Sequence, residues 1–182
     1  MNRREALKII LAGGIASSLT PLWYPLATAY PLKSRYSGRL SVHNMHTDES
    51  LTVCYLKKNK RFDPSALNQL NHLFRCHYTG KVHHIQPELF LLLDMVRSHL
   101  GANERPFQLV SGYRSPEYNR LLRNRSRQVA RKSYHLRGMA ADIQLEGVEL
   151  PAVRDAAKCL NMGGVGTYDQ FIHLDVGPVR YW

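Results

Sequence analysis

The chain has the size and composition of one ordinary globular domain. It holds 182 residues, 44% of them hydrophobic, which is enough to form a sizeable core and excludes wholesale disorder. Beyond the N-terminus there is no run of about 18 apolar residues, so the body of the protein is not a membrane bundle. A net charge of +11 predicts an anionic partner, such as nucleic acid, an acidic membrane surface or a polymer that carries carboxylates.

The first thirty residues have the layout of a bacterial export signal. A basic head with two adjacent arginines precedes an apolar stretch over residues 9–26, and Ala27-Thr28-Ala29 supplies a small-x-small cleavage pattern. Paired arginines are typical of twin-arginine signals. We therefore expect residues 1–29 to be a cleaved signal peptide, with an uncleaved anchor as the alternative. The expected location is the periplasm, with no stable membrane insertion after cleavage and no nucleic-acid partner.

The rest of the chain contains short strands and helices in irregular order, which predicts an α+β domain over residues 39–182 after a linker over 30–38. Period-two alternation predicts the strands, and Asp63-Pro64 has the favoured order for a helix start. In chain order, the predicted elements are strands at 40–46 and 51–56, a helix from Pro64, a helix at 87–100, a strand at 107–110, a helix at 116–123, a strand at 139–145, a helix at 151–162 and a strand at 171–176.

Three cysteines, Cys54, Cys76 and Cys159, lie at no C-x-x-C or zinc-finger spacing. Because their number is odd, at most one disulfide can form. We expect buried, unpaired thiols.

Two of the nine histidines stand in patterns that suggest chemistry, whereas most of the others fit surface or packing roles. His135 precedes Asp142 by seven residues, in a segment that leads into a strand. In the strand at 171–176, alternation places His173 and Asp175 on the face opposite the apolar residues. Two histidines and one carboxylate form a known catalytic zinc set that leaves one position open for water. By spacing alone, an unrelated His-Asp pair and a core histidine are the alternative.

Longer stretches around these residues resemble the LAS zinc peptidases, a group with lysostaphin-type enzymes, D-Ala-D-Ala carboxypeptidases and the hedgehog signalling domain. Within that group the chain is most similar to the murein endopeptidase K family. The stretches that carry the resemblance are 109–115, 132–135, 163–168 and 171–178, together with the leader and the ending 177–182. The similarity covers nearly the whole chain.

The resemblance implies a fold, a metal site and a reaction. The expected fold is α+β, with a small antiparallel sheet that carries the site and packs with helices. His135, Asp142 and His173 would be the ligands of a zinc ion. The expected partner is peptidoglycan, whose peptide cross-links would be hydrolysed at amide bonds, especially those between two meso-diaminopimelate residues, with zinc-bound water as nucleophile. The oligomeric state is not predicted.

The general base can be assigned to more than one residue. D-Ala-D-Ala carboxypeptidases place a Glu three residues before the last zinc histidine, but position 170 here is Gln, which is a poor proton acceptor. Asp175 is the expected base, and Asp169 is the alternative. A second role for Asp175 is to orient a ligand histidine or Arg114.

Arg114 follows a predicted strand through a Ser-Gly-Tyr turn. We expect Arg114 to anchor a substrate carboxylate or to stabilise the oxyanion, with a salt bridge to Asp142 or Asp175 as the alternative.

The stretch 114–137 holds eight cations and one acid. We expect this basic stretch to attract the substrate, with a solvated surface as the alternative. Two further functions stay open: a carboxypeptidase that trims stem peptides, and an inactive zinc-containing cell-wall module.

Overall fold

The computed structural model describes residues 36–127 and 129–182. The predicted signal peptide and residues 30–35 of the predicted linker lie outside these residues. The helices are α1 (Pro64–Leu73), α2 (Pro87–His99), α3 (Pro116–Arg125), α4 (Leu150–Leu160) and a 3-10 turn (Tyr134–Arg137). The strands are β1 (Arg39–Asn44), β2 (Glu49–Cys54), β3 (Phe107–Ser111), β4 (Ala140–Leu145), β5 (Gly164–Thr167), β6 (Ile172–Asp175) and β7 (Arg180–Tyr181). The predicted α+β class is confirmed.

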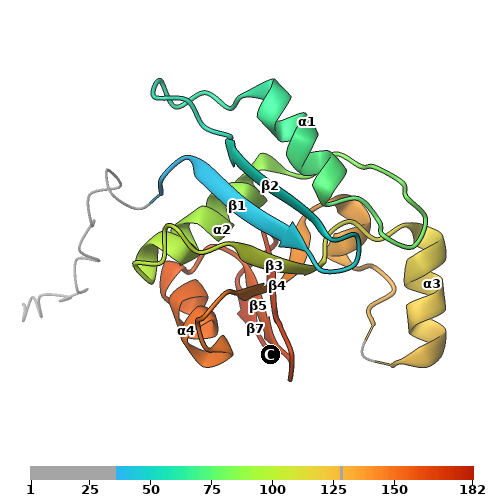
Figure 1. The fold of residues 1–182 in the computed structure, drawn as a ribbon. Coiled ribbons are helices and arrows are strands. Elements are labelled where there is room, and N and C mark those ends of the chain that lie inside the picture. The colour runs from blue at the N-terminus through green and yellow to red at the C-terminus, as the bar shows by residue number, and fades with distance from the viewer. Residues whose placement is uncertain (1–35, 128) are drawn as a thin grey trace, which may run out of the picture. The chain divides into compact units, whose positions relative to one another are not determined.

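The strands form one sheet in the order β2-β1-β3-β4-β6-β5-β7. It is mixed, so the expectation of an antiparallel sheet is wrong at two places, where β1 pairs with β3 and β5 pairs with β7 in parallel. The first parallel pair is possible because β2, α1 and α2 separate β1 from β3 in the chain, and this connection is long enough to return β3 beside β1 in the same direction. Figure 1 shows α1 beside the β1–β2 hairpin and α4 near β5, toward the other end of the sheet.

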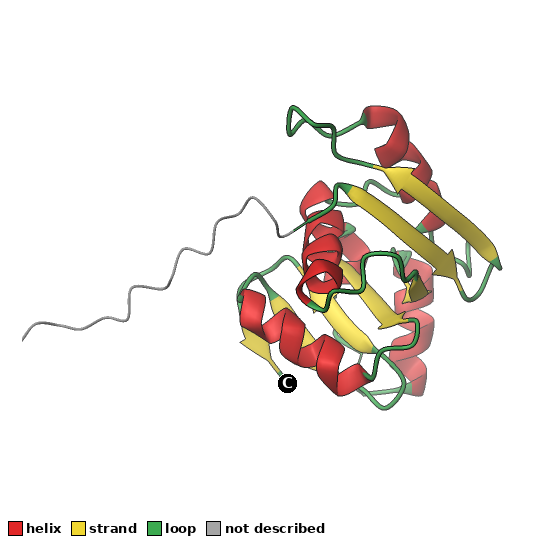
Figure 2. Ribbon diagram, turned by 60° about the vertical axis from the view of Figure 1, so that its left-hand side comes forward, coloured by secondary structure: helices red, strands yellow, loops and turns green. Residues whose placement is uncertain are grey.

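The two faces of the central strands β4 and β6 carry different kinds of side chain. Ala141, Ile143 and Leu145 of β4, like Ile172 and Leu174 of β6, belong to the buried core. Since side chains alternate across a strand, the residues between them project from the other face. The helices supply the rest of the core, and Figure 2 shows them packed around the strands. The predicted functional side chains of β4 and β6 therefore share the face that does not carry the apolar core.

Local chemistry explains where several elements begin and end. The carboxylate of Asp63 accepts hydrogen bonds from the first turn of α1, and Ser115 Oγ accepts one from Tyr118 N in α3, so both predicted helix starts are confirmed. The strand predicted at 40–46 ends earlier, because the side chain of Asn44 accepts hydrogen bonds from the next turn at 3.0 and 3.3 Å. Likewise α4 ends at Leu160, because Asn161 adopts a left-handed conformation with φ of 53°.

Buried hydrogen bonds and an ion pair connect the start of β1 to α2. Asp94 is fully buried and accepts hydrogen bonds from Gly38 N at 2.7 Å and from Tyr55 Oη at 2.9 Å. Arg97, also buried, lies 3.4 Å from the same carboxylate. Such a pair is stable in the interior only when its polar groups have partners, and the chain entering β1 supplies several of them.

The cysteines of the described chain are unpaired. Cys76 is buried as expected, but Cys54 and Cys159 are exposed, because they lie on the outer sides of β2 and α4. No helix in the described ranges is long and apolar enough to cross a membrane.

Candidate metal centre

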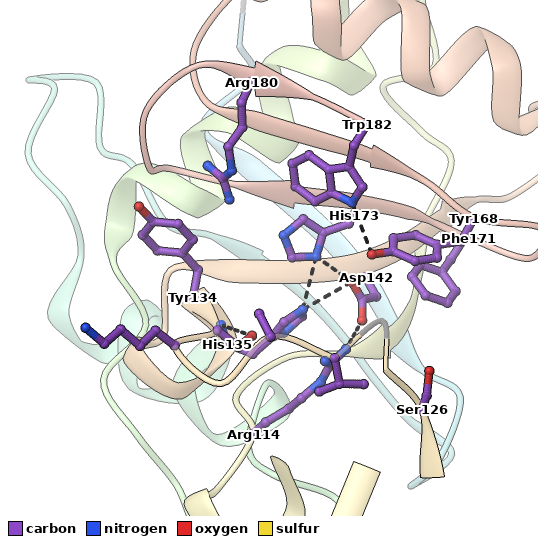
Figure 3. Close-up of a pocket in the computed structure, with 14 residues that line it drawn as sticks. Arg114, Ser126, Tyr134, His135, Asp142, Tyr168, Phe171, His173, Arg180 and Trp182 are labelled. Carbon is purple, nitrogen blue, oxygen red and sulfur yellow. Dashed lines mark hydrogen bonds and ion pairs between the residues drawn. The ribbon is translucent and has the colours of Figure 1, made fainter. Parts of the chain in front are cut away.

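Three predicted ligands meet on the polar face of the sheet. Asp142 and His173 are directly opposite each other in the β4–β6 ladder, so their side chains project together. His135 comes from the 3-10 turn, and the residue that caps the start of this turn, Ser133, accepts a hydrogen bond from His135 N on its Oγ at 3.3 Å. Figure 3 shows the three side chains converging. His135 Nε2 lies 3.1 Å from Asp142 Oδ1 and from His173 Nδ1, and His173 Nδ1 lies 2.7 Å from Asp142 Oδ1.

The other ring nitrogen of each histidine is hydrogen-bonded to the protein. His135 Nδ1 donates to the carbonyl oxygen of Gly112 at 2.7 Å, which assigns its proton to that nitrogen. His173 Nε2 donates to Asp175 Oδ2 at 3.2 Å. With these tautomers, the lone pairs of His135 Nε2 and His173 Nδ1 face the carboxylate oxygen of Asp142. This pattern, in which outer hydrogen bonds orient the rings, is characteristic of metal-binding histidines.

The donor set fits a divalent cation. Three acceptors that face one another without a proton between them repel, and a cation removes that repulsion. Ligand atoms around tetrahedral zinc lie about 3.3 Å apart, close to the separations of 2.7–3.1 Å found here. Within the residues that the structure describes, this trio is the one group of His, Cys, Asp and Glu side chains with metal-binding geometry.

Burial and charge keep two of the predicted ligands in the protonation states that a metal site requires. Burial, helped by the positive charge of Arg114, lowers the pKa of His135 to about 4, so its ring is neutral at pH 7. Burial alone would raise the pKa of Asp142, but His135 and Arg114 hold it below its usual range. Burial would lower the pKa of His173, but hydrogen bonds to Asp142 and Asp175 raise it, so a proton competes with a metal ion for this ring.

Arg114 lies beside the trio. Its Nη2 donates to Asp142 Oδ2, and its Nε donates to Ser111 Oγ at 2.9 Å. The two oxygens of Asp142 therefore have different partners: Oδ1 faces the histidines and Oδ2 faces Arg114. The salt bridge that was the alternative for Arg114 is present, and the guanidinium also lines the pocket above the trio.

The two candidate bases lie in different surroundings. Asp175 is fully buried behind His173, on the side of the ring away from His135 and Asp142. Burial opposes its ionisation, but hydrogen bonds from His173, Arg180 and Gly177 N lower its pKa to about 2. Asp169 is exposed, between β5 and β6. Among the described residues that line the pocket, Asp142 is the only carboxylate.

The trio lies in a pocket of about 540 Å³. Three cations and four aromatic side chains form much of its wall: Arg114, Lys132, Arg180, Tyr134, Tyr168, Phe171 and Trp182. Of the eight cations in the stretch 114–137, Arg114 and Lys132 line this pocket.

Three of the lining residues, Arg180, Tyr168 and Trp182, were not predicted from the sequence to have a role in the site. The only signal for Arg180 and Trp182 was their place in the ending 177–182, because β7 is too short to show a strand pattern.

Comparison with known proteins identifies the family of this chain. The family described as peptidoglycan L,D-endopeptidase MepK (Peptidase_M15_2) matches residues 33–182. The peptidoglycan L,D-endopeptidase MepK of Escherichia coli strain K12 is 39% identical over 187 aligned positions, which cover 100% of this chain and 97% of that protein. The probable peptidoglycan L,D-endopeptidase MepK of Haemophilus influenzae is 36% identical, covering 100% and 95% respectively. The chain therefore belongs to the MepK family of M15 peptidases.

Proposed function

We propose that this protein is a zinc-dependent endopeptidase that hydrolyses amide bonds in the peptide cross-links of peptidoglycan. The convergence of His135, Asp142 and His173 at the base of a cationic pocket is the observation that carries the proposal. The relatives, which are named peptidoglycan endopeptidases, supply the substrate class. The preference for cross-links that contain meso-diaminopimelate comes from the family resemblance and is part of the proposal.

The three ligands and Arg114 have separate roles in this proposal. His135, Asp142 and His173 hold the metal, and two imidazoles with one carboxylate suit zinc. A bound zinc ion supplies Lewis acidity, which lowers the pKa of water and polarises an amide carbonyl. Arg114, held by Asp142 and Ser111, stabilises the negative charge that develops on the carbonyl oxygen.

For Asp175, the contacts favour the orienting role over the role of general base. Its carboxylate accepts hydrogen bonds from His173, Gly177 N and Arg180, and it lies behind the ligand ring. We propose that it keeps the proton of His173 on Nε2 and so leaves Nδ1 for the metal. The base role requires the carboxylate to reach the other side of the ring.

We also propose that the protein acts in the periplasm, after export by the twin-arginine route. Peptidoglycan, the substrate in the names of the relatives, supports this location. The basic head, apolar stretch and Ala27-Thr28-Ala29 exit of the leader support the export route.

Incubation of the zinc-loaded protein with defined cross-linked muropeptides, followed by mass spectrometry, tests the activity. We expect wild type to convert dimers to monomers, and His135→Ala to lose at least about 100-fold in rate because one of three ligands is missing. His99→Ala, an exposed histidine on α2, is the matched control and should retain full activity.

Other products would replace the proposal with one of its rivals. Loss of a terminal residue with the dimers still joined would identify a carboxypeptidase. Absence of any product from a protein that holds one zinc ion per chain would identify a binding module.

A further inference from the structure

Arg180 of β7 lies in the pocket wall and has no part in the proposed metal chemistry. Its Nη1 and Nη2 donate to Asp175 Oδ1 and Oδ2 at 3.1 and 2.6 Å, an end-on pair with a fully buried carboxylate. Nη1 also donates to the carbonyl oxygen of Pro178 at 3.0 Å. The guanidinium carbon lies 4.8 Å from the ring centre of Tyr134 and 4.9 Å from that of Trp182. The guanidinium is therefore held in one place by a carboxylate and two aromatic rings.

The end-on pair leaves another edge of the guanidinium for a ligand. The Nε–H and the outer Nη2–H form a second fork, for which no protein partner is found in the described chain. The side chain of Arg180 is 38% exposed, whereas that of Arg114 is 14% exposed and is engaged by Asp142 and Ser111. Figure 3 shows Arg180 reaching from β7 toward the region between Tyr134 and His173. A planar fork of this kind matches a carboxylate in a bidentate arrangement.

Glycines at three separate positions make room for this assembly. A Cβ at Gly164 would lie 2.8 Å from Arg180 Nη1, and one at Gly166 would lie 2.6 Å from the indole of Trp182. A Cβ at Gly177 would lie 2.5 Å from Cζ of Tyr134. All three distances are too short for any residue but glycine without movement of a neighbour. The Arg180 guanidinium and the two rings that flank it, Tyr134 and Trp182, thus each pack directly against backbone that carries no side chain.

We propose that Arg180 is the residue that anchors a free carboxylate of the substrate peptide in this pocket. This inference rests on the proposed function, because it names how that substrate is recognised. The ligand class is an acidic peptide, and the recognition element is the second fork of Arg180. Lys132 and Arg114 add positive charge to the same wall, while Asp142 is the only carboxylate among the described lining residues. An anion entering the pocket is therefore favoured over a neutral peptide.

Binding, measured apart from hydrolysis, tests this anchor. The ligands are two cross-linked stem peptides whose cross-link amide is reduced to an uncleavable amine, one with free carboxyl groups and one with every carboxyl group amidated. Titration calorimetry with the zinc-loaded protein gives both affinities. We expect wild type to bind the free-carboxyl peptide about 10- to 100-fold more tightly, the range for a hydrogen-bonded charged group.

The variants assign that preference to a residue. Arg180→Gln should bind both peptides equally, at the affinity of the amidated one, and Arg180→Lys should recover only part of the preference because it lacks the fork. Arg137→Gln is the matched control: Arg137 lies over the same Tyr134 ring at 5.4 Å but does not line the pocket, so the preference should stay at the wild-type value.

Three results would overturn the anchor: equal binding of the two peptides by wild type, failure of wild type to bind either, or a full preference in Arg180→Gln. Should Arg180→Gln fail to fold, a full preference in Arg180→Lys would overturn it instead. The same preparations, assayed with the cleavable dimer, separate this inference from the proposed function. A carboxylate preference lost in Arg180→Gln without hydrolysis by wild type would refute only the endopeptidase, whereas hydrolysis without such a preference would refute only the anchor.

Discussion

His135 and His173 each use one ring nitrogen for a hydrogen bond to an outer partner and turn the other toward Asp142 Oδ1. The partners differ in charge: Gly112 offers a neutral carbonyl oxygen, whereas Asp175 offers a buried carboxylate. A carboxylate partner makes an imidazole more basic and a stronger ligand, so His173 depends more on its outer partner than His135 does.

This difference gives a prediction for Asp175. Asp175→Ala should weaken zinc binding by about 10- to 100-fold, because His173 loses the group that orients it. Asp175→Asn should weaken it less, since the amide oxygen still accepts the Nε2 proton. Zinc affinity, measured by competition with a chelator, checks both variants. If zinc affinity is unchanged in both variants while hydrolysis is lost, Asp175 is the general base.

At the scale of elements, the pocket depends on short, glycine-containing strands at the end of the sheet. β5 lies between β6, which carries His173, and β7, which carries Arg180. Trp182 follows β7, and its indole packs against Gly166 of β5, with its Nε1 donating to Tyr168 Oη at 3.2 Å. The ring of Trp182 is tilted against that of His173, with the centroids 5.4 Å apart. The C-terminal strand therefore forms part of the site itself.

Gly166→Ala tests this packing. The new methyl group would collide with the indole of Trp182 and should lower the free energy of unfolding by about 1–3 kcal/mol, as overpacking does. In a Trp182→Ala background the indole atoms nearest to the new methyl group are gone, so the cost of the substitution should largely disappear. Denaturant unfolding of the four proteins of this cycle gives the coupling free energy. An equal cost in both backgrounds would show that the indole is not what Gly166 accommodates.

For the whole molecule, contacts between polar side chains connect parts of the chain that are distant in sequence. Asp94 of α2 binds the chain entering β1, and His77, which follows α1, stacks on His46 with ring centroids 3.8 Å apart. His77 also contacts Tyr118 Oη at 3.1 Å. Burial, with His46 and Arg114 nearby, lowers the pKa of His77 to about 4.

The His77 shift predicts how stability depends on pH. As the pH falls from about 6.5 to 4, the unfolded chain takes up a proton on this ring before the folded chain does, so the free energy of unfolding falls. His77→Gln should remove about 1 kcal/mol of that fall, less than the full linkage value because the ring is partly solvated. Urea unfolding at pH 7, 5.5 and 4 measures it. Equal pH slopes for the two proteins would contradict the prediction.

Local sequence was sufficient for most of the elements. Caps such as Asp63 and Ser115 act within one turn, and the alternation along β4 and β6 separates core residues from site residues without help from the rest of the fold. β5 was missed because Gly163 to Gly166 has the composition of a turn. It is a strand because β6 and β7 pair with it on both sides.

The sequence by itself determined which residue types could bind a metal, and their alternation put Asp142 and His173 on polar faces. Three further facts came only from the tertiary structure: the nitrogen that each histidine presents, the oxygen of Asp142 that faces Arg114, and the placement of Arg180 between Tyr134 and Trp182. The reason is geometric. The three arrangements depend on hydrogen bonds and ring contacts between segments that meet only when the whole sheet has formed, and no local propensity encodes them.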